Sequence, residues 1–369
     1  MKAVKLLPRL IRAESPSGRE SQVAQVLWEA LEAIGLSPAL DDAGNLEAVV
    51  GEGPHEVVLT GHMDVVPAGD PAEWPYPPYA GEEARGAIWG RGTVDMKGAL
   101  AAMVEALEIL KTRPLAGAVR FLAVVQEEVG GAGSRFAAQR LRPRAIILGE
   151  PSELKVMRGH RGRLEAEARF KGKLAHAARP SAGLNPLFPL AKFLSSLESL
   201  ELPQDPVLGS ATCTPTRVFS EPGAGNVVPG LAGATIDYRS VPGEETSTIL
   251  ARLRNLAVGG EVYLPQMERI SGEAEISYPA AYPPYLLADD DPALQTALAT
   301  QGLASAGVWW FTTDAPYLAT TGAPVIGFGP GDPELAHTTR EHLPLEALEA
   351  SVTGYVNLAE ALLKWATKS

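Results

Sequence analysis

Residues 57–64 read Val-Val-Leu-Thr-Gly-His-Met-Asp, an apolar run followed by a glycine and two polar residues. Residues 57–60 predict a short buried strand that ends at Gly61. Side chains two apart in an extended chain point the same way, so His62 and Asp64 should share a face at the strand's carboxyl end. Open α/β sheets place their sites at that end. A carboxylate beside an imidazole often orients a metal-binding histidine, so the stretch favours a metal site over an ordinary surface turn.

Length, composition and charge limit the class of protein. A chain of 369 residues favours more than one domain, and 46% apolar with 21% charged residues is typical of a globular protein. The net charge of −12 argues against a general nucleic-acid binder. One cysteine, Cys213, excludes an internal disulfide framework and fits a reducing compartment. No stretch resembles a signal peptide or a membrane span, so we expect a cytoplasmic protein without a membrane partner.

Strands and helices alternate through the first and last parts of the chain. The alternation predicts a doubly wound α/β sheet. Ser17, with Glu20 three residues later, matches a capping box and predicts the start of a helix. The expected strands are 45–50, 57–60, 119–125, 145–148 and 324–328, and the expected helices include 97–110, 134–141 and 345–364.

The middle of the chain has a different pattern. Residues 163–170 alternate strictly between apolar and charged side chains, which indicates a half-buried strand of an antiparallel sheet. Helices over 185–200 and 244–257 and strands over 211–219, 231–239 and 273–278 should accompany it. The sequence therefore predicts a smaller α+β domain over 159–286, inserted into a catalytic domain made of 1–158 and 287–369.

Several acids and His62 follow the expected buried strands or open a helix, and His337 lies in a loop rich in Pro and Gly. Each one alone has an ordinary explanation, such as a solvated acid pair, a helix cap or a turn. Together the carboxylates would repel one another, and two divalent cations would remove that repulsion. Mixed imidazole and carboxylate ligands suit Zn²⁺ or Co²⁺, and a spare carboxylate could act as general base in amide hydrolysis. The candidate ligands are His62, Asp95, Glu128, Glu150 and His337, and the spare carboxylate is Glu127.

Five motifs then occur in order: GHMDVVPAG (61–69), GRGTVDMKG (90–98), QEEVGGAGS (126–134), GEP (149–151) and GPGDPELAHTTREH (329–342). With these, essentially the whole chain resembles the M20 dinuclear zinc peptidases and deacylases. The resemblance implies that Asp95 bridges two metal ions, with His62 and Glu150 on one and Glu128 and His337 on the other. It also implies that Asp64 orients His62, that Glu127 is the general base, and that the Asp95–Met96 peptide is cis.

The expected inserted domain resembles the family's ferredoxin-like lid and dimerisation domain, which implies a homodimer. His176 then resembles the histidine that reaches the partner's active site and stabilises the oxyanion. Asn226 and Arg239 resemble ligands of a substrate carboxylate, and Arg179, in the motif of His176, is assigned with them. Without the resemblance, these residues read as a solvated histidine, a turn asparagine and exposed arginines.

Within the family, His160-Arg161-Gly162 and the run GPGDPELAHT look closer to acetylornithine deacetylases and LysK-type hydrolases than to succinyl-diaminopimelate desuccinylases. LysK-type enzymes release lysine or ornithine from the C-terminal Glu of an acidic amino-group carrier protein, and we expect that activity. The main alternative is N-acetylornithine deacetylation; desuccinylation of succinyl-diaminopimelate and a general aminoacylase or dipeptidase activity are further ones.

A basic stretch over 155–179 offers an independent hint about the partner. This stretch contains eight Lys and Arg residues, and its only acidic residues are Glu165 and Glu167. In an acidic protein, such a stretch could attract an acidic carrier, although solvated strand faces would explain it equally well. Thr313 and Asp314 match the corresponding family segment only loosely, so their role stays open.

Overall fold

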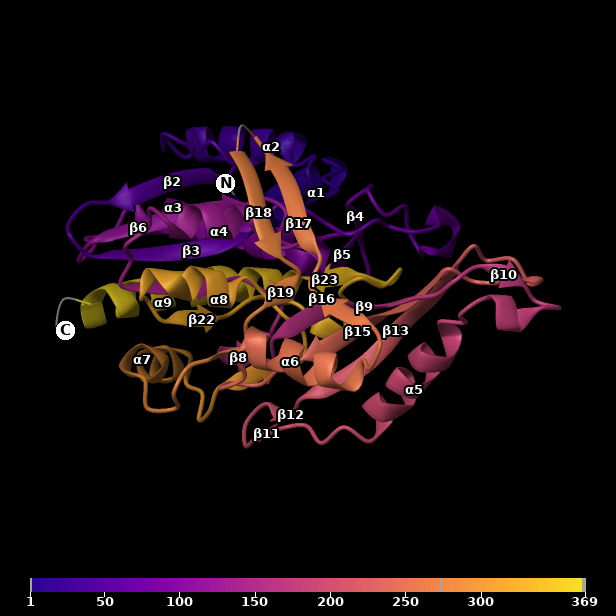
Figure 1. Cartoon of the computed structure of the whole chain (residues 1–369). Helices are drawn as coiled ribbons and strands as arrows, with labels where there is room; N and C mark the ends of the chain where they lie inside the picture. Colours follow the sequence, from indigo (N-terminus) through magenta and orange to yellow (C-terminus); the bar gives the residue numbers. More distant parts are fainter. Residues whose placement is uncertain (1, 273, 367–369) are drawn as a thin grey trace.

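Two β-sheets, each with a hydrophobic core of its own, organise the chain (Figure 1). The computed structural model describes residues 2–272 and 274–366. In this part of the chain, no helix combines the length and the apolar character that crossing a membrane requires.

The larger region is built on a nine-stranded mixed sheet, ordered β1-β2-β6-β3-β7-β22-β8-β20, with β21 also pairing with β8. The neighbours β6, β3, β7 and β22 run parallel, whereas β2 and β20 pair antiparallel. The predicted α/β class is confirmed. The strands are β1 (Ala39–Leu40), β2 (Leu46–Gly51), β3 (Glu56–His62), β6 (Ala118–Val124), β7 (Ala145–Leu148), β8 (Met157–His160), β20 (Tyr285–Leu286), β21 (Gly307–Trp309) and β22 (Val325–Gly327).

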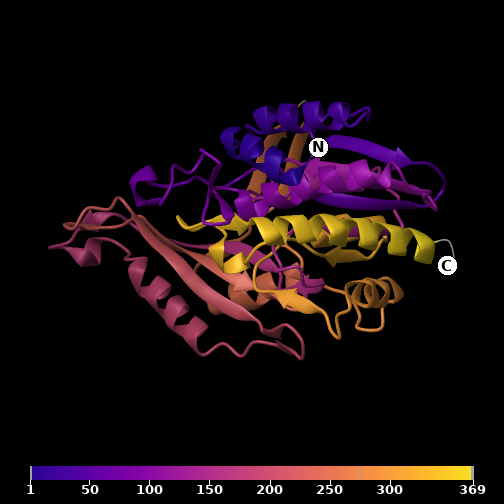
Figure 2. The ribbon, with the colours of Figure 1, turned by 180° about the vertical axis from the view of Figure 1, so that it is seen from behind.

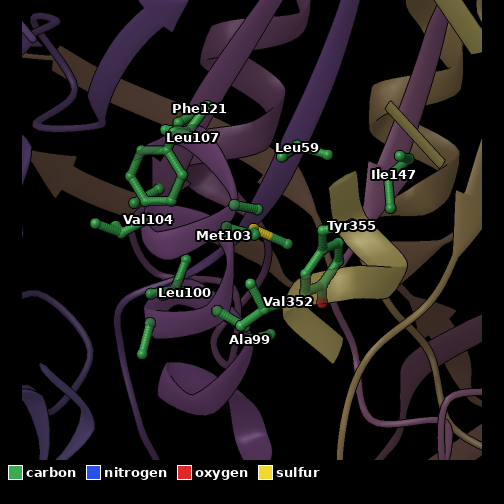
Figure 3. Close-up of a cluster of buried hydrophobic side chains, with 14 of the residues drawn as sticks. Leu59, Ala99, Leu100, Met103, Val104, Leu107, Phe121, Ile147, Val352 and Tyr355 are labelled. Atoms are coloured by element: carbon green, nitrogen blue, oxygen red, sulfur yellow. The ribbon is translucent and has the colours of Figure 1, made fainter. Parts of the chain in front are cut away.

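Helices cover both faces of this sheet, which explains why β3 reads as an unbroken apolar run. Val57 and Leu59 point into the core that contains α3 and α9, and Val58 points into the core on the opposite face. Figure 3 shows Leu59 near Met103 of α3 and Tyr355 of α9, and Figure 2 shows α9 lying along the sheet. The helices are α1 (Ala3–Arg12), α2 (Ser21–Ala33), α3 (Gly98–Leu110), α4 (Ala132–Ala138), α7 (Pro292–Gln301), α8 (Ala315–Leu318) and α9 (Leu345–Ala366).

The smaller region is an antiparallel sheet ordered β13-β15-β9-β16, with β19 also pairing with β9. Its chain order, βαββαβ, gives the expected ferredoxin-like arrangement. A separate core forms around Phe170, Phe193 and Tyr238. The domain boundaries remain a prediction, and β20, inside the predicted insertion, pairs with β8 of the larger sheet. The elements are β9 (Arg163–Lys171), α5 (Leu187–Glu198), β13 (Thr212–Glu221), β15 (Leu231–Arg239), α6 (Thr246–Leu256), β16 (Glu261–Tyr263) and β19 (Ala281–Tyr282).

Short elements surround the two sheets. The hairpin of β17 (Gln266–Ser271) and β18 (Ala274–Pro279) leaves the smaller region and reaches α2 of the larger one (Figure 1). The predicted strand 273–278 corresponds to β18, although residue 273 lies outside the described residues. The other short elements are β4 (Glu82–Ala84), β5 (Ala87–Trp89), β10 (Ala175–His176), β11 (Gln204–Asp205), β12 (Gly209–Ser210), β14 (Val227–Val228), β23 (His342–Pro344), the 3-10 turns at Pro71–Glu73, Pro180–Ala182, Ala319–Thr321 and Pro333–Leu335, and a π-turn at Thr93–Lys97.

The predicted capping box at Ser17 and Glu20 is wrong. Helix α2 begins at Ser21, and the Ser17 hydroxyl donates to Asp64 Oδ2 at 2.7 Å. Glu20 Oε1 instead accepts the backbone N–H groups of Gly18 and Gln126, at 2.7 and 3.1 Å. Buried polar groups of distant loops need partners, and this need outweighs the local capping pattern.

A matched pair of valine variants tests the central position of β3. Val57 is fully buried, whereas Val258 is 80% exposed. We expect Val57→Ala to lower the free energy of unfolding by about 2 kcal/mol, because it removes buried methyl groups and leaves a cavity. Val258→Ala should change it by less than about 0.5 kcal/mol. Denaturant unfolding of both variants measures the difference, and equal values would contradict the assigned core.

Candidate metal centre

The parallel strands deliver acids and a histidine to one edge of the larger sheet. His62 ends β3, Glu127 and Glu128 follow β6, and Glu150 follows β7. The carboxyl ends of neighbouring parallel strands meet at one edge, so these residues converge. Asp95 joins them from the π-turn before α3. Its peptide bond to Met96 is cis, as the resemblance implied.

Asp95 lies between two histidines. Its Oδ1 is 2.9 Å from His62 Nε2, and its Oδ2 is 3.2 Å from His337 Nε2. Each carboxylate oxygen therefore faces a different imidazole. This is the geometry that a carboxylate bridging two metal ions requires.

Two groups of potential ligands share Asp95. The first group adds His62 and Glu150, and the second adds Glu128 and His337; within each group the ligand atoms lie within 4.8 Å of one another. His337 Nε2 is 3.0 Å from Glu128 Oε1, and His62 Nε2 is 3.9 Å from Glu150 Oε1. The structure thus brings together all five predicted ligands, in the two sets that the resemblance implied.

The backbone fixes the tautomer of His62. Its Nδ1 lies 2.9 Å from the carbonyl oxygen of Asp64, and a carbonyl can only accept a hydrogen bond. Nδ1 therefore carries a proton, and Nε2, which is directed at Asp95, is the nitrogen available to a metal ion. Two electron-pair donors at 2.9 Å repel each other unless a proton or a cation lies between them. The arrangement therefore fits a metal ion bound through Nε2.

Asp64 contacts more than His62. Its Oδ1 is 3.6 Å from His62 Nδ1, longer than a hydrogen bond. Its carboxylate accepts the backbone N–H groups of Glu127 and Glu128, at 3.0 and 3.2 Å, and the Ser17 hydroxyl. Asp64 therefore fixes the loop after β6, a role that the sequence did not indicate.

Crowding of the carboxylates perturbs their protonation. Burial, followed by the charge of Asp314, raises the pKa of Glu127 well above its ordinary value, and burial with Asp95 does the same for Glu150. Burial opposes ionisation of Asp95 as well, but His337 and His62 outweigh it and lower the pKa of Asp95. Hydrogen bonds to Asp95 and Glu128 raise the pKa of His337 to about 10. Buried acids that oppose one another's ionisation need additional positive charge.

The donor set fits a pair of dications. Glu150 Oε1 is buried and accepts no hydrogen bond from any described residue, so it is free to bind a metal ion. Imidazole and carboxylate donors together suit Zn²⁺ or Co²⁺. Glu127 belongs to neither ligand group, although it lines the same cavity.

Glu341 holds the backbone of Asp95 in place. It is fully buried, and its Oε1 accepts the N–H groups of Gly92, Val94 and Asp95 at 2.9, 3.0 and 3.2 Å. Its other oxygen pairs with the buried guanidinium of Arg91. The sequence analysis missed Glu341, and its place inside the motif 329–342 is the signal that could have found it.

A cavity of about 600 Å³ opens onto the ligand groups. Its lining includes the predicted Arg239 and two arginines that were not predicted as site residues, Arg161 and Arg163. Asp237 joins two of them: its carboxylate accepts Arg239 Nε at 2.7 Å and Arg163 Nε at 3.1 Å. The smaller sheet therefore presents guanidinium groups to the site. Sequence alternation placed Arg163 on a polar strand face without showing what that face contacts.

Three predicted residues lie elsewhere. His176, Arg179 and Asn226 are exposed, and none of them lines the cavity. They gather around β10, at the outer end of the smaller region (Figure 1), where Ala177 N–H donates to the Asn226 carbonyl at 2.9 Å. A single chain does not bring them to its own metal centre.

Thr313 and Asp314 lie behind the cavity. Asp314 is 1% exposed, and neither of its carboxylate oxygens accepts a hydrogen bond from the described residues. Burial raises the pKa of Asp314 to about 6. The Thr313 N–H donates to His160 Nε2 at 3.3 Å. Asp314 thus adds a buried acid beside Glu127 that sequence matching left unresolved.

Comparisons with known proteins agree with this geometry. The family model described as Peptidase family M20/M25/M40 matches residues 58–361. The protein YgeY of Escherichia coli (strain K12) is 30% identical over 356 residues, which cover 91% of this chain and 88% of YgeY. An acetylornithine deacetylase of Myxococcus xanthus is 31% identical over 341 residues, which cover 86% of each chain.

A solved structure extends the likeness to three dimensions. The YXEP protein of Bacillus subtilis, described as a dinuclear metal-binding peptidase, matches with a TM-score of 0.73 over 98% of both chains. Its sequence identity is 17%, so this match supports the fold. The likenesses extend over both the larger and the smaller region.

Replacing Glu341 tests its hold on the metal centre. Glu341→Gln leaves Arg91 without its buried counter-charge and weakens the bonds to three backbone N–H groups. We expect the affinity for zinc to fall by roughly 10- to 100-fold, as for other groups that orient ligands. Competition with a chelator measures the zinc affinity. Glu349→Gln, on the exposed face of α9, is the control. Equal zinc affinities in the two variants would refute this role.

Proposed function

Because the chain belongs to peptidase family M20/M25/M40, whose members cleave amide bonds, we propose that it is a two-metal amidohydrolase. The observation that carries this proposal is the pair of ligand groups that share Asp95. His62, Asp95 and Glu150 would hold one Zn²⁺, and Asp95, Glu128 and His337 the other, with Co²⁺ as a substitute. When bound, such ions polarise the scissile carbonyl and acidify the attacking water.

Glu127 is the proposed general base. It lines the cavity beside both ligand groups, and Asp64 fixes its backbone N–H at 3.0 Å. Its position leaves the carboxylate free to take a proton from water and return it to the leaving amine.

The arginines favour a substrate with more than one carboxylate. Arg161, Arg163 and Arg239 face a cavity that also contains four carboxylates. With two dications present, and with Asp237 and Glu165 counted as the acidic partners of Arg163 and Arg239, the site keeps roughly one excess positive charge. Lysine joined to the side chain of a C-terminal Glu has a free carboxylate on each side of the scissile amide. N-acetylornithine has only one carboxylate.

We therefore propose release of lysine or ornithine from the C-terminal Glu of an acidic carrier protein. Deacetylation of N-acetylornithine is the second candidate, because a Myxococcus xanthus relative bears that name. The basic stretch 155–179 is weaker support for an acidic carrier protein as substrate than its composition suggests. Most of its charges have acidic partners within the chain, namely Lys155, Arg158, Arg163, Arg169 and Lys171. Arg161 lines the cavity and forms no ion pair within the described residues, so it is the stronger support.

A homodimer through the smaller region is part of the proposal. Large apolar side chains are exposed near β10: Leu174 is 57% exposed, Leu184 63% and Phe188 70%. Exposed apolar side chains gathered in this way are typical of an interface. A partner docked there would bring its own His176 toward the metal centre, where an imidazolium can stabilise the oxyanion.

A side-by-side assay discriminates the two substrates. We expect the zinc-loaded enzyme to release amine from a carrier protein bearing lysine on its terminal Glu, and to act on N-acetylornithine at least about 10-fold less efficiently. Arg163→Ala should lower kcat/KM for the carrier by roughly 10- to 100-fold, because it removes a charged hydrogen-bond donor. Arg169→Ala, on the same strand outside the cavity, is the control. Efficient deacetylation with an inert carrier would make the enzyme a deacetylase.

Mixed dimers test the sharing of His176. We expect Glu127→Gln and His176→Ala each to reduce turnover by at least about 100-fold as homodimers. Unfolding and reassembly of the two together should restore about a quarter of wild-type activity, because half of the dimers then contain one complete site. Mixing without reassembly is the control. If reassembled mixtures stay inactive while dimers form, His176 does not act across the interface.

A further inference from the structure

A second cavity is lined by Val125 and Gln126, which directly precede Glu127. It has a volume of about 370 Å³, within the range that small ligands occupy. Helix α2, the turn after β1 and the tip of the β17–β18 hairpin at Gly272 form its walls. The proposed reaction at the metal centre does not use it.

The walls combine opposite charges with apolar surface. Glu20 is 6% exposed, and its Oε1 accepts both of its backbone hydrogen bonds. Arg19, next to it, is exposed, and its guanidinium has no ion-pair partner within residues 2–272 and 274–366. Trp28 and Leu40 line the same space, and Leu40 is 54% exposed despite its apolar side chain.

This combination matches the chemistry of a zwitterion. An ammonium group would find the Glu20 carboxylate, a carboxylate would find Arg19, and an aliphatic chain would cover Trp28 and Leu40. Burial, followed by the charge of Asp64, raises the pKa of Glu20 to about 7. Within residues 2–272 and 274–366 no Lys, Arg or His forms an ion pair with Glu20, and a bound ammonium would supply that counter-charge.

Glu20 connects this cavity to the catalytic loop. Its Oε1 accepts the N–H of Gln126, the residue directly before Glu127. Gln126 has a φ of +56°, a left-handed conformation that its surroundings must hold in place. The next two N–H groups donate to Asp64 from the metal side. Two carboxylates on opposite sides thus position the loop, and one of them lines the second cavity.

We propose that this cavity binds a free amino acid with a long alkyl chain, such as lysine, and that occupancy lowers turnover at the metal centre. The ammonium group draws the Glu20 carboxylate toward itself and lengthens the hydrogen bond that Glu20 accepts from Gln126 N–H. The loop bearing Glu127 then loses one of its two fixed points. The effect falls on kcat, because the cavity is separate from the one that takes the substrate.

Inhibition by free lysine tests the proposal, with whichever substrate the enzyme turns over in the preceding assay. Turnover is measured from the decrease in mass of the carrier protein, or from the acetate released from N-acetylornithine. Neither measurement is disturbed by the added lysine. We expect lysine to lower kcat of the wild type. Cadaverine, which lacks the carboxylate, should have no effect on kcat at the same concentration. Lysine bound as a product at the metal centre would raise KM instead, so the two modes separate.

Arg19→Ala is the decisive variant, because this exposed side chain can be removed without disturbing a core. Its basal turnover should equal that of the wild type, and about 10-fold more lysine should be needed to lower kcat. Arg113→Ala, an exposed arginine after α3, is the matched control and should respond as the wild type. Inhibition that raises KM alone, or a kcat effect unchanged in Arg19→Ala, would overturn the proposal.

Discussion

Several carboxylates are buried together at one edge of the larger sheet, and their repulsion shapes the structure around them. Asp95 turns one oxygen toward His62 and the other toward His337, while Glu128, Glu150 and Glu127 crowd around it. Their mutual repulsion would force protonation or local opening. The site therefore needs bound cations. Binding cations in turn requires that the ligand side chains are held in fixed positions.

A surrounding layer of carboxylates supplies that rigidity by accepting backbone N–H groups. Glu341 holds the Asp95 turn, Asp64 holds the loop of Glu127 and Glu128, and Glu20 holds Gln126 from outside. Each bond is charge-assisted and mostly buried, so it is stronger than a neutral one. The same arrangement gives the loop a contact with the second cavity. The hydrogen bonds that hold the loop of Glu127 rigid therefore also connect it to the second cavity, where the proposed ligand would act.

The smaller region contributes charge to the site more than it contributes structure. Arg163 and Arg239 come from adjacent strands of its sheet, and Asp237 keeps their guanidinium groups together at the cavity. Alternation along β9 was readable in the sequence, but the pattern gives only a polar face. Whether such a face meets solvent or a catalytic cavity depends on how the two sheets pack, which no local pattern encodes.

The amino-acid order was enough to predict the α/β class, five strands of the larger sheet and the five candidate ligands, because apolar runs and the polar residues that flank them are local patterns. Only the tertiary structure decided how those groups divide around Asp95 and that Glu341, Arg161 and Arg163 join the site. It also placed His176, Arg179 and Asn226 at the outer end of the smaller region, and it replaced the capping box by bonds from Ser17 and Glu20 to distant loops. Those outcomes depend on hydrogen bonds and charges between residues far apart in the chain, and folding alone brings such residues together.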